Sequence, residues 1–193
     1  MAEEKRIVLA SGSPRRRELL QSAGIPFDVM TADVEEARIE GEPPEQMVQR
    51  LATLKAKAVA ARCPDRVVLG ADTVVVLDST VLGKPRNLDD ARKMLAALSG
   101  RTHRVLTGVA LLSPNEPPDV WCCRTAVTFK TLSMADIENY LSLVDVLDKA
   151  GSYAIQSHGE LLVEAIDGLL SNVIGLPVED VKEHLGRWNC KDA

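Results

Sequence analysis

The sequence predicts an α/β fold with a mixed β-sheet in one domain. Strand-like and helix-like patterns alternate along most of the chain, which is typical of βα units. Two stretches interrupt this alternation with apolar runs that return through short polar segments, which predicts hairpins and therefore antiparallel neighbours in the sheet. A chain of 193 residues fits one domain that buries well over half of its unfolded surface. We therefore expect residues 1–193 to form a single domain.

The predicted elements follow one another in a simple order. Pro14 suits the first position of a helix, and Gly100 suits the position just past the end of another. In the first half we expect strands at 8–10 and 27–30, helices at 14–23 and 43–62, a hairpin of strands 67–77 and 81–82, and a helix at 88–98. In the second half we expect long antiparallel strands at 103–112 and 120–129, a helix at 134–144, a strand at 161–166 and a closing helix at 178–188.

The composition is that of an ordinary globular protein and limits its partners. Hydrophobic residues make up 46% of the chain and charged residues 26%. The formal net charge of −5 argues against a broad surface for nucleic-acid polymers or anionic membranes, so small phosphorylated ligands fit better. The charged N-terminus and the short apolar run after it indicate neither a signal peptide nor a membrane span, and we expect a cytoplasmic protein.

The four cysteines favour a reducing compartment. They form no C-x-x-C pair, and the adjacent Cys122 and Cys123 would point to opposite faces of a strand. We expect all four, which also include Cys63 and Cys190, to be buried free thiols.

A short turn after the first expected strand combines features of an anion-binding site. Ser11 lies in this turn, and Ser13 is a good N-cap for the helix that begins at Pro14. Arginines at 15–17 then fill the first helical turn, where each exposed cation costs about a few tenths of a kcal/mol because the helix N-terminus is already partly positive. An anion such as a phosphate chain would explain this combination. The alternative is that the arginines face solvent or pair with acidic residues elsewhere.

Two charged residues lie in otherwise apolar surroundings. Lys55 falls within the apolar stripe of helix 43–62, whereas Arg50 lies on the other side, so Lys55 either reaches a helix edge or meets an anion. Asp72 interrupts the most apolar run of the chain, and an uncompensated buried carboxylate costs about several kcal/mol. Lys84, on the return strand of the hairpin, would lie roughly opposite Asp72 and supply the compensating charge. The alternative is a turn-capping aspartate and a solvated lysine.

The remaining candidates are carboxylate and amide side chains. Glu35 and Glu36 lie in an expected loop, where carboxylates are usually solvated, but a phosphate site that uses a hard divalent cation needs carboxylates. The three histidines are widely spaced and show no metal-ligand pattern. Gln156, next to a glycine turn and an aromatic residue, either reads the edge of a nucleobase or bonds to the backbone.

Two familiar catalytic motifs do not fit the sequence. Gly83 and Lys84 form no P-loop, because Asp78 stands where the first glycine belongs and Pro85 where Ser or Thr belongs. The sequence also has no G-x-S-x-G segment, so a serine hydrolase has no support.

Seven short segments follow one another along nearly the whole chain. They are Ser11-Gly12-Ser13-Pro14-Arg15-Arg16, Lys55, Gly70-Ala71-Asp72-Thr73, Gly83-Lys84-Pro85, Leu98-Ser99-Gly100-Arg101, Asp148-Lys149-Ala150-Gly151 and Gly175-Leu176-Pro177. Together they resemble the Maf family of nucleoside triphosphate pyrophosphatases. The resemblance implies an inosine triphosphatase-like domain, with an elongated twisted mixed sheet flanked by helices and a central nucleotide-binding cleft. It also implies a homodimer, cleavage between the α- and β-phosphates with Mg²⁺ or Mn²⁺, and an association with restraint of septum formation in bacteria.

The resemblance assigns roles residue by residue. Asp72 matches the general base, and Glu35 matches an acidic residue near the metal and the attacking water, so these two are the candidate metal ligands. Lys84 matches a phosphate-binding position and joins them as a candidate catalytic residue. The candidate substrate-binding residues are Ser11, Ser13, Arg15, Arg16, Lys55, Thr73 and Gln156.

The same resemblance separates two substrate classes. The subgroup that hydrolyses dTTP and UTP resembles this chain at Arg15, Thr73 and Gln156, whereas the 7-methyl-GTP subgroup typically has tryptophan in place of Arg15. We therefore expect hydrolysis of dTTP, UTP or modified pyrimidine triphosphates to the monophosphate and pyrophosphate. A 7-methyl-GTP pyrophosphatase and a non-catalytic nucleotide-binding regulator of cell division are the alternatives. The chain departs from the usual family pattern at Ser152, Ala154, Ser157, His158 and Asp145-Val146, near the expected base pocket.

Overall fold

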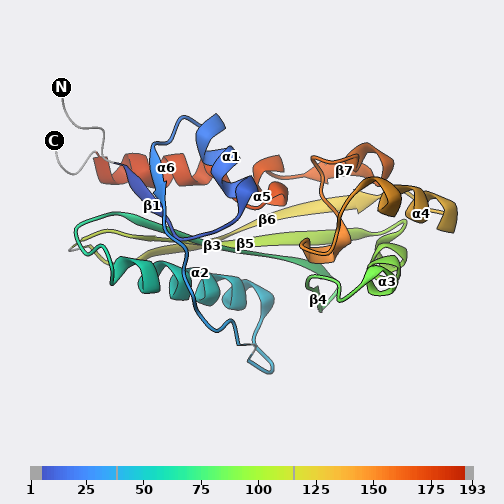
Figure 1. Cartoon of the computed structure of the whole chain (residues 1–193), viewed down its shortest axis with the longest axis horizontal. Helices are drawn as coiled ribbons and strands as arrows, with labels where there is room; N and C mark the ends of the chain where they lie inside the picture. Colours follow the sequence, from blue (N-terminus) through green and yellow to red (C-terminus); the bar gives the residue numbers. More distant parts are fainter. Residues whose placement is uncertain (1–5, 38, 115, 190–193) are drawn as a thin grey trace. The chain divides into compact units, whose positions relative to one another are not determined.

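The computed structural model describes residues 6–37, 39–114 and 116–189, and it contains a mixed sheet with helices (Figure 1). The strands are β1 (Ile7–Leu9), β2 (Phe27–Val29), β3 (Val68–Leu77), β4 (Thr80–Leu82), β5 (Thr102–Leu112), β6 (Asp119–Phe129) and β7 (Val163–Asp167). The α-helices are α1 (Pro14–Ser22), α2 (Pro44–Ala60), α3 (Leu88–Leu98), α4 (Met134–Leu143), α5 (Leu170–Ile174) and α6 (Val178–Asn189), with 3₁₀ turns η1 (Ala150–Ser152) and η2 (Gly159–Leu161).

The sheet confirms the predicted α/β class with mixed strand directions. Its order is β2-β1-β3-β5-β6-β7, and β4 pairs with β3 outside this path. The strand β1 runs parallel to both β2 and β3, as the βα alternation predicts. The strands β3 and β4 form the predicted antiparallel hairpin, and β7 runs antiparallel to β6. That the two longest strands, β5 and β6, are antiparallel to each other stays a prediction.

The residues group into two compact units. The first comprises Met1–Asp72, Thr107–Cys123 and Gly175–Ala193, and the second comprises Thr73–Leu106 and Arg124–Ile174. The strands β3, β5 and β6 each contribute residues to both units. Whether the chain behaves as one domain in solution stays a prediction.

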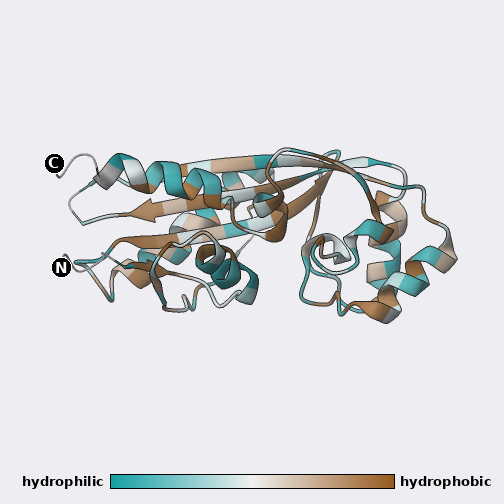
Figure 2. Ribbon diagram, turned by 90° about the horizontal axis from the view of Figure 1, so that it is seen from above, coloured by the Kyte–Doolittle hydropathy of each residue, from teal (hydrophilic) through white to brown (hydrophobic). Residues whose placement is uncertain are grey.

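In the first unit, alternate residues of β1 face opposite sides of the sheet. Ile7 and Leu9 pack into a cluster with Leu20 of α1 and Val181 of α6, whereas Val8 packs with the alanines and Val59 of α2. The helices α1 and α6 therefore cover one face of this part of the sheet and α2 covers the other (Figure 1). The strands are hydrophobic along much of their length, while the helices alternate between hydrophobic and hydrophilic residues (Figure 2).

The close approach of α2 to the sheet depends on a glycine. A Cβ atom added to Gly70 would lie 2.3 Å from the carbonyl oxygen of Ala52 and 2.9 Å from the backbone nitrogen of Ala56. Both contacts are with the helix backbone, which cannot move aside without shifting α2. The small residue in β3 therefore sets how near α2 lies to the strand that carries Asp72.

The second unit has a core of its own. Its helices begin with side-chain caps: Asn87 accepts a hydrogen bond from the Asp90 backbone, and Ser133 and Asp136 form a capping box. Gly100 has a positive φ just past the end of α3, as predicted. The buried cluster of this unit includes Val75, Leu77, Leu95, Leu98, Phe129, Ile137, Tyr140 and Tyr153.

The structure differs from the predicted elements after α4. The predicted strand 161–166 starts only at Val163, because Gly159–Leu161 forms the 3₁₀ turn η2. The five-residue helix α5 was not predicted, since one turn is too short to show a helical period. Its Asn172 donates hydrogen bonds to the Val105 carbonyl at 3.1 Å and to Thr125 at 3.0 Å. Long-range polar contacts of this kind, rather than local pattern, hold α5 in place.

The prediction of buried cysteines is wrong in degree. Cys63, Cys122 and Cys123 are free but only half-buried, and Cys190 lies outside the described residues. Burial is still the largest influence on the two neighbours, and it raises the pKa of Cys122 to about 11 and that of Cys123 to about 12. Both side chains are therefore protonated thiols at neutral pH.

Candidate functional site

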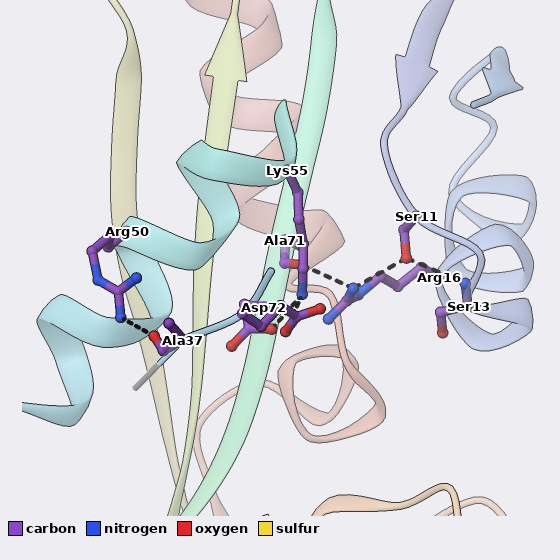
Figure 3. A network of polar contacts seen from close by, with 9 residues as sticks. Ser11, Ser13, Arg16, Ala37, Arg50, Lys55, Ala71 and Asp72 are labelled. Atoms are coloured by element: carbon purple, nitrogen blue, oxygen red, sulfur yellow. Dashed lines mark hydrogen bonds and ion pairs between the residues drawn. The ribbon is translucent and has the colours of Figure 1, made fainter. Parts of the chain in front are cut away.

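The turn that leads into α1 is organised by Arg16. Its guanidinium donates hydrogen bonds to Ser11 Oγ at 3.1 Å and to the Ala71 carbonyl at 2.9 Å (Figure 3). It also donates to the Gly175 carbonyl at 2.9 Å. Burial lowers the pKa of Arg16, and the nearby Asp72 carboxylate opposes this effect. Arg16 therefore points into the protein, which overturns the alternative of a solvated side chain for this residue.

Ser13 occupies the predicted N-cap position but does not cap the helix with its side chain. Its hydroxyl makes no capping hydrogen bond, and its own backbone N–H donates to Ser11 Oγ at 3.2 Å. Pro14 stands at the start of α1, as predicted. The Ser11 hydroxyl thus accepts hydrogen bonds both from the turn and from Arg16, which fixes the loop between β1 and α1.

Lys55 points inward from α2 and forms an ion pair with Asp72. Lys55 Nζ lies 2.7 Å from Asp72 Oδ1, and only 13% and 11% of the two side chains are exposed (Figure 3). The apolar stripe of α2 brings this about, because Val48, Ala52 and Val59 on the same face are fully buried. Asp72 therefore has the compensating cation that its burial requires.

Within the first unit, the ammonium on Asp72 is that of Lys55, whereas the sequence favours Lys84 as the compensating cation. A contribution of Lys84 to this charge stays a prediction. Lys84 is exposed, follows β4 and belongs to the second unit. The strand β4 ends at Leu82, so the hairpin pairing stops before it reaches Lys84.

Glu36 joins this group from the loop between β2 and α2. Its Oε2 lies 3.0 Å from Lys55 Nζ, so one ammonium is shared by the carboxylates of Glu36 and Asp72. The neighbouring Glu35, the residue that the family resemblance favours, is exposed like Glu36, and its role near the metal stays a prediction. No pattern in the sequence distinguishes two adjacent loop glutamates, since neither belongs to a periodic element.

Arg50 lies outside the buried face of α2, as the helical period predicts, but it is not free in solvent. It is half-buried, and its guanidinium holds Glu42 with two hydrogen bonds of 2.7 Å each. It also donates to the Ala37 carbonyl at 3.0 Å (Figure 3). These bonds lower the pKa of Glu42 and raise that of Arg50. Helical periodicity cannot show these contacts, because both partners lie in the loop before α2.

The second unit carries the remaining predicted site residues, Thr73, Lys84 and Gln156. Thr73 follows Asp72 directly in β3 and is half-buried, whereas Lys84 and Gln156 are exposed. The Gly151 backbone N–H donates to the Gly83 carbonyl at 3.0 Å, so the segment before Gln156 is tied next to Lys84. Gly151 has a positive φ of 69°, and a Cβ there would lie 2.9 Å from a Val75 methyl group.

The segment that leads to Gln156 is also fixed by buried polar contacts. Tyr153 OH lies 2.8 Å from His103 Nε2, and the Ala154 N–H donates to Tyr140 OH at 2.9 Å. His103 and Tyr140 are both fully buried. Gln156 therefore extends from a rigid support within the second unit.

The described residues hold no ready-made metal centre. Nowhere in 6–37, 39–114 or 116–189 do three or more His, Cys, Asp or Glu residues come together as a possible metal site. The convergent carboxylates of Glu36 and Asp72 are hard oxygen donors, of the kind that Mg²⁺ and Mn²⁺ prefer. Mg²⁺ commonly takes one or two carboxylates and completes its shell with water and substrate phosphates, so this donor set fits such a cation.

Among the helices that the structure describes, none has both the length and the apolar character needed to cross a membrane.

Comparison with known proteins places the chain in one family. Residues 6–188 match the family described as Maf-like protein. A protein of Akkermansia muciniphila named dTTP/UTP pyrophosphatase is 49% identical over 179 residues, which are 93% of this chain and 94% of that protein. A protein of Moorella thermoacetica with the same name is 50% identical over 181 residues, which are 93% of each chain. A third, from Bacillus cereus, is 46% identical over 185 residues, or 96% of each chain.

Solved structures give more distant matches. The Ham1 protein of Staphylococcus aureus matches with a TM-score of 0.47 and 18% identity, over 65% of this chain and 72% of that one. A HAM1 protein from Coxiella burnetii matches with a TM-score of 0.46 and 20% identity, over 63% of this chain and 70% of that one.

Proposed function

Because the chain belongs to the Maf-like protein family, we propose that it is a nucleoside triphosphate pyrophosphatase that hydrolyses dTTP and UTP to the monophosphate and pyrophosphate. The name shared by relatives that match over nearly their whole length supports this activity. The structural observation that carries the proposal is the buried pair of Lys55 and Asp72 beside the Arg16 guanidinium. A carboxylate held among cations suits hydrolysis of an anionic polyphosphate.

In the proposed reaction, Asp72 acts as the general base. Lys55 holds Oδ1 of this carboxylate, and we assign the other oxygen to accept a proton from the attacking water. The water oxygen forms a bond to the α-phosphorus, the bond from that phosphorus to the bridging oxygen breaks, and pyrophosphate leaves with the electron pair. Negative charge that develops on the phosphate oxygens is stabilised by the nearby cations.

The N-terminal turn of α1 is proposed to bind the phosphates. Free backbone N–H groups at a helix start attract anions, and Ser11, Ser13 and Arg15 surround this helix start. Arg16 donates hydrogen bonds to two backbone carbonyls, so its proposed role is to fix the shape of the turn and to add positive charge near the phosphates. Arginines at a helix N-terminus are repelled by its partial positive charge, and a bound phosphate would compensate this repulsion.

A divalent cation, Mg²⁺ or Mn²⁺, is proposed as the cofactor. Asp72 and Glu35 are the ligands that the family resemblance implies, and Glu36 is the neighbouring carboxylate that the structure adds as a candidate. When bound, such a cation would neutralise phosphate charge and make the attacking water more acidic. The chain's own residues would hold it through carboxylate oxygens and hold the phosphates through arginine and lysine.

The nucleobase is proposed to be recognised by the second unit. Thr73 and Gln156 carry groups that can donate and accept hydrogen bonds, and Gln156 extends from the segment tied to Tyr140 and His103. Lys84, next to the Gly83 carbonyl that holds Gly151, would add a further cation for the phosphates. The side-chain amide of Gln156 can both donate a hydrogen bond to the edge of a pyrimidine base and accept one from it.

The activity is tested by incubating the purified chain with dTTP, UTP, CTP and 7-methyl-GTP in the presence of Mn²⁺. We expect pyrophosphate and monophosphate from dTTP and UTP, with products separated by chromatography. Release of phosphate and diphosphate instead would indicate cleavage of another anhydride. Binding of dTTP without turnover would replace the enzyme by a nucleotide sensor, and preference for 7-methyl-GTP would move the chain to that substrate class.

The cellular setting proposed for the chain rests on family membership. We propose a cytoplasmic homodimer that acts on free nucleotides rather than on nucleic-acid polymers or membranes, and a link to restraint of septum formation. The net charge of −5 agrees with small anionic ligands held at a local site. Light scattering of the purified chain tests the dimer, and elution at the monomer mass would reject it.

A further inference from the structure

The loop between β2 and α2 lies along α2 and is held there by three cations. We call residues 31–42 the acidic loop, of which residue 38 lies outside the described part of the chain. Arg62, just past α2, donates to the Thr31 carbonyl at 3.1 Å, and Lys55 pairs with Glu36. Arg50 holds the far end through Ala37 and Glu42.

We propose that Arg50 is a positioning residue that pins the acidic loop to α2 and so places Glu36 beside Lys55 and Asp72. The assignment rests on the proposed function, because it concerns the carboxylates expected near the metal and the attacking water. The hydrogen bonds from its guanidinium go to Glu42 and to the carbonyl of Ala37, the residue directly after Glu36. The Asp72 carboxylate is close enough to add a weaker through-space attraction to Arg50.

The geometry explains why an arginine is needed here. Its planar fork meets both oxygens of Glu42 at 2.7 Å, and one of the same nitrogens reaches the Ala37 carbonyl at 3.0 Å. Bidentate charge-assisted bonds of this kind fix orientation as well as distance. Only 10% of the Glu42 side chain is exposed, so the pair is shielded from solvent more than a surface ion pair. A lysine would supply one charged nitrogen and could not form the same set of bonds.

The acidic loop needs such an anchor because no regular backbone hydrogen bonding of a helix or strand holds its first half. Residues 30–37 belong to no helix or strand. The Lys55–Glu36 pair is half-exposed on the Glu36 side, at 49% of that side chain, and an ion pair of this exposure contributes little by itself. Fixing the Ala37 carbonyl anchors the backbone one residue after Glu36, which restricts where the Glu36 carboxylate can lie.

The proposal is tested first without nucleotide, by hydrogen exchange of the loop amides. The variants are Arg50→Lys and Glu42→Gln, and the control is Lys57→Ala, an exposed residue of the same helix. We expect exchange of the acidic loop to rise about tenfold in the two loop variants, with the core strands unchanged, and to stay at the wild-type rate in the control. Wild-type exchange in Arg50→Lys would overturn the proposal.

The second readout separates positioning from general stability. We expect Arg50→Lys to lower kcat about tenfold and to raise the Mn²⁺ concentration needed for half-maximal activity, with little change in KM for dTTP, because Arg50 contacts the loop and not the phosphates. A loop that exchanges faster while kcat and the Mn²⁺ requirement stay at wild-type values would also overturn it. If the wild type shows no turnover, the proposed function fails, whereas the exchange result still decides whether Arg50 pins the loop.

Discussion

Lys55 Nζ donates a hydrogen bond of 2.7 Å to Asp72 Oδ1, which joins the inner face of α2 to a buried strand. Both side chains are largely removed from solvent, so each charge helps to compensate the other, together with Glu36 beside Lys55 and Arg16 beside Asp72. The helix is kept near the strand by Gly70, which leaves room for the Ala52 carbonyl. The packing that builds the core therefore also builds the charged pair on which the proposed chemistry depends.

Replacing Lys55 by Met should destabilise the protein, because the Asp72 carboxylate would stay buried without its partner. We expect a loss of about 3 kcal/mol in the free energy of unfolding, measured by urea denaturation. The double variant Lys55→Met with Asp72→Asn should recover much of this loss, since no uncompensated charge is then buried. Equal losses in Lys55→Met and in the exposed control Lys57→Met would contradict this account.

Asp72→Asn isolates the chemical role of the carboxylate. The amide keeps the size of the side chain and can still accept a hydrogen bond from Lys55, but it is a poor proton acceptor. We expect dTTP turnover to fall by about a hundredfold to ten-thousandfold while nucleotide binding is retained. Pyrophosphate release near the wild-type rate, measured alongside equilibrium binding, would reject Asp72 as the general base.

The sequence was sufficient to predict that Lys55 and Asp72 are buried, but not that they meet. The helical stripe orients Lys55, and the apolar run around Asp72 implies a partner. Which cation compensates Asp72 depends on how closely α2 packs on β3. The local sequence pattern carries no information on the distance between these two elements. The same holds for Arg16, whose acceptor at Gly175 lies far along the chain. Periodicity recovered most elements, whereas tertiary contacts decided the partners.

Replacing Arg16 by lysine should destabilise the protein, because the planar guanidinium of Arg16 holds three acceptors together. Its Nε and Nη1 reach the Gly175 and Ala71 carbonyls and the Ser11 hydroxyl, and a lysine nitrogen cannot serve all three. We expect a loss of about 2 kcal/mol in unfolding free energy, because buried carbonyls lose their donors. The matched control is Arg17→Lys at the exposed neighbour, and a loss of the same size there would remove the argument.

Buried His103 predicts how stability depends on pH. Burial lowers its pKa from 6.5 to about 4, and Nδ1 has no hydrogen-bond partner among the described residues. The unfolded chain therefore binds a proton between these values that the folded chain does not, so stability falls as pH drops from 6.5 towards 4. The contribution of this residue should be roughly 2–3 kcal/mol between pH 7.5 and about 4.5.

The measurement compares urea unfolding of the wild type and of His103→Gln at the two pH values. Glutamine can keep a hydrogen bond to Tyr153 but does not titrate, so the variant should lose less stability on acidification. Parallel pH dependences of the two proteins would show that His103 is not the group responsible.

Two glycines should respond in opposite directions to replacement by alanine. A Cβ on Gly108 of β5 would lie 2.2 Å from the backbone carbonyl carbon and oxygen of Val48 in α2, so the helix would have to shift. We expect Gly108→Ala to lower the free energy of unfolding by about 3 kcal/mol or more, and to lower dTTP turnover because α2 also carries Lys55.

Gly186 lies in α6, and a Cβ there meets nothing within 4 Å. Gly186→Ala should therefore stabilise the protein by about 0.5–1 kcal/mol, since alanine favours the helix. Thermal unfolding of both variants checks the pair, and a Gly108→Ala protein as stable as the wild type would mean that α2 does not pack against β5 this closely.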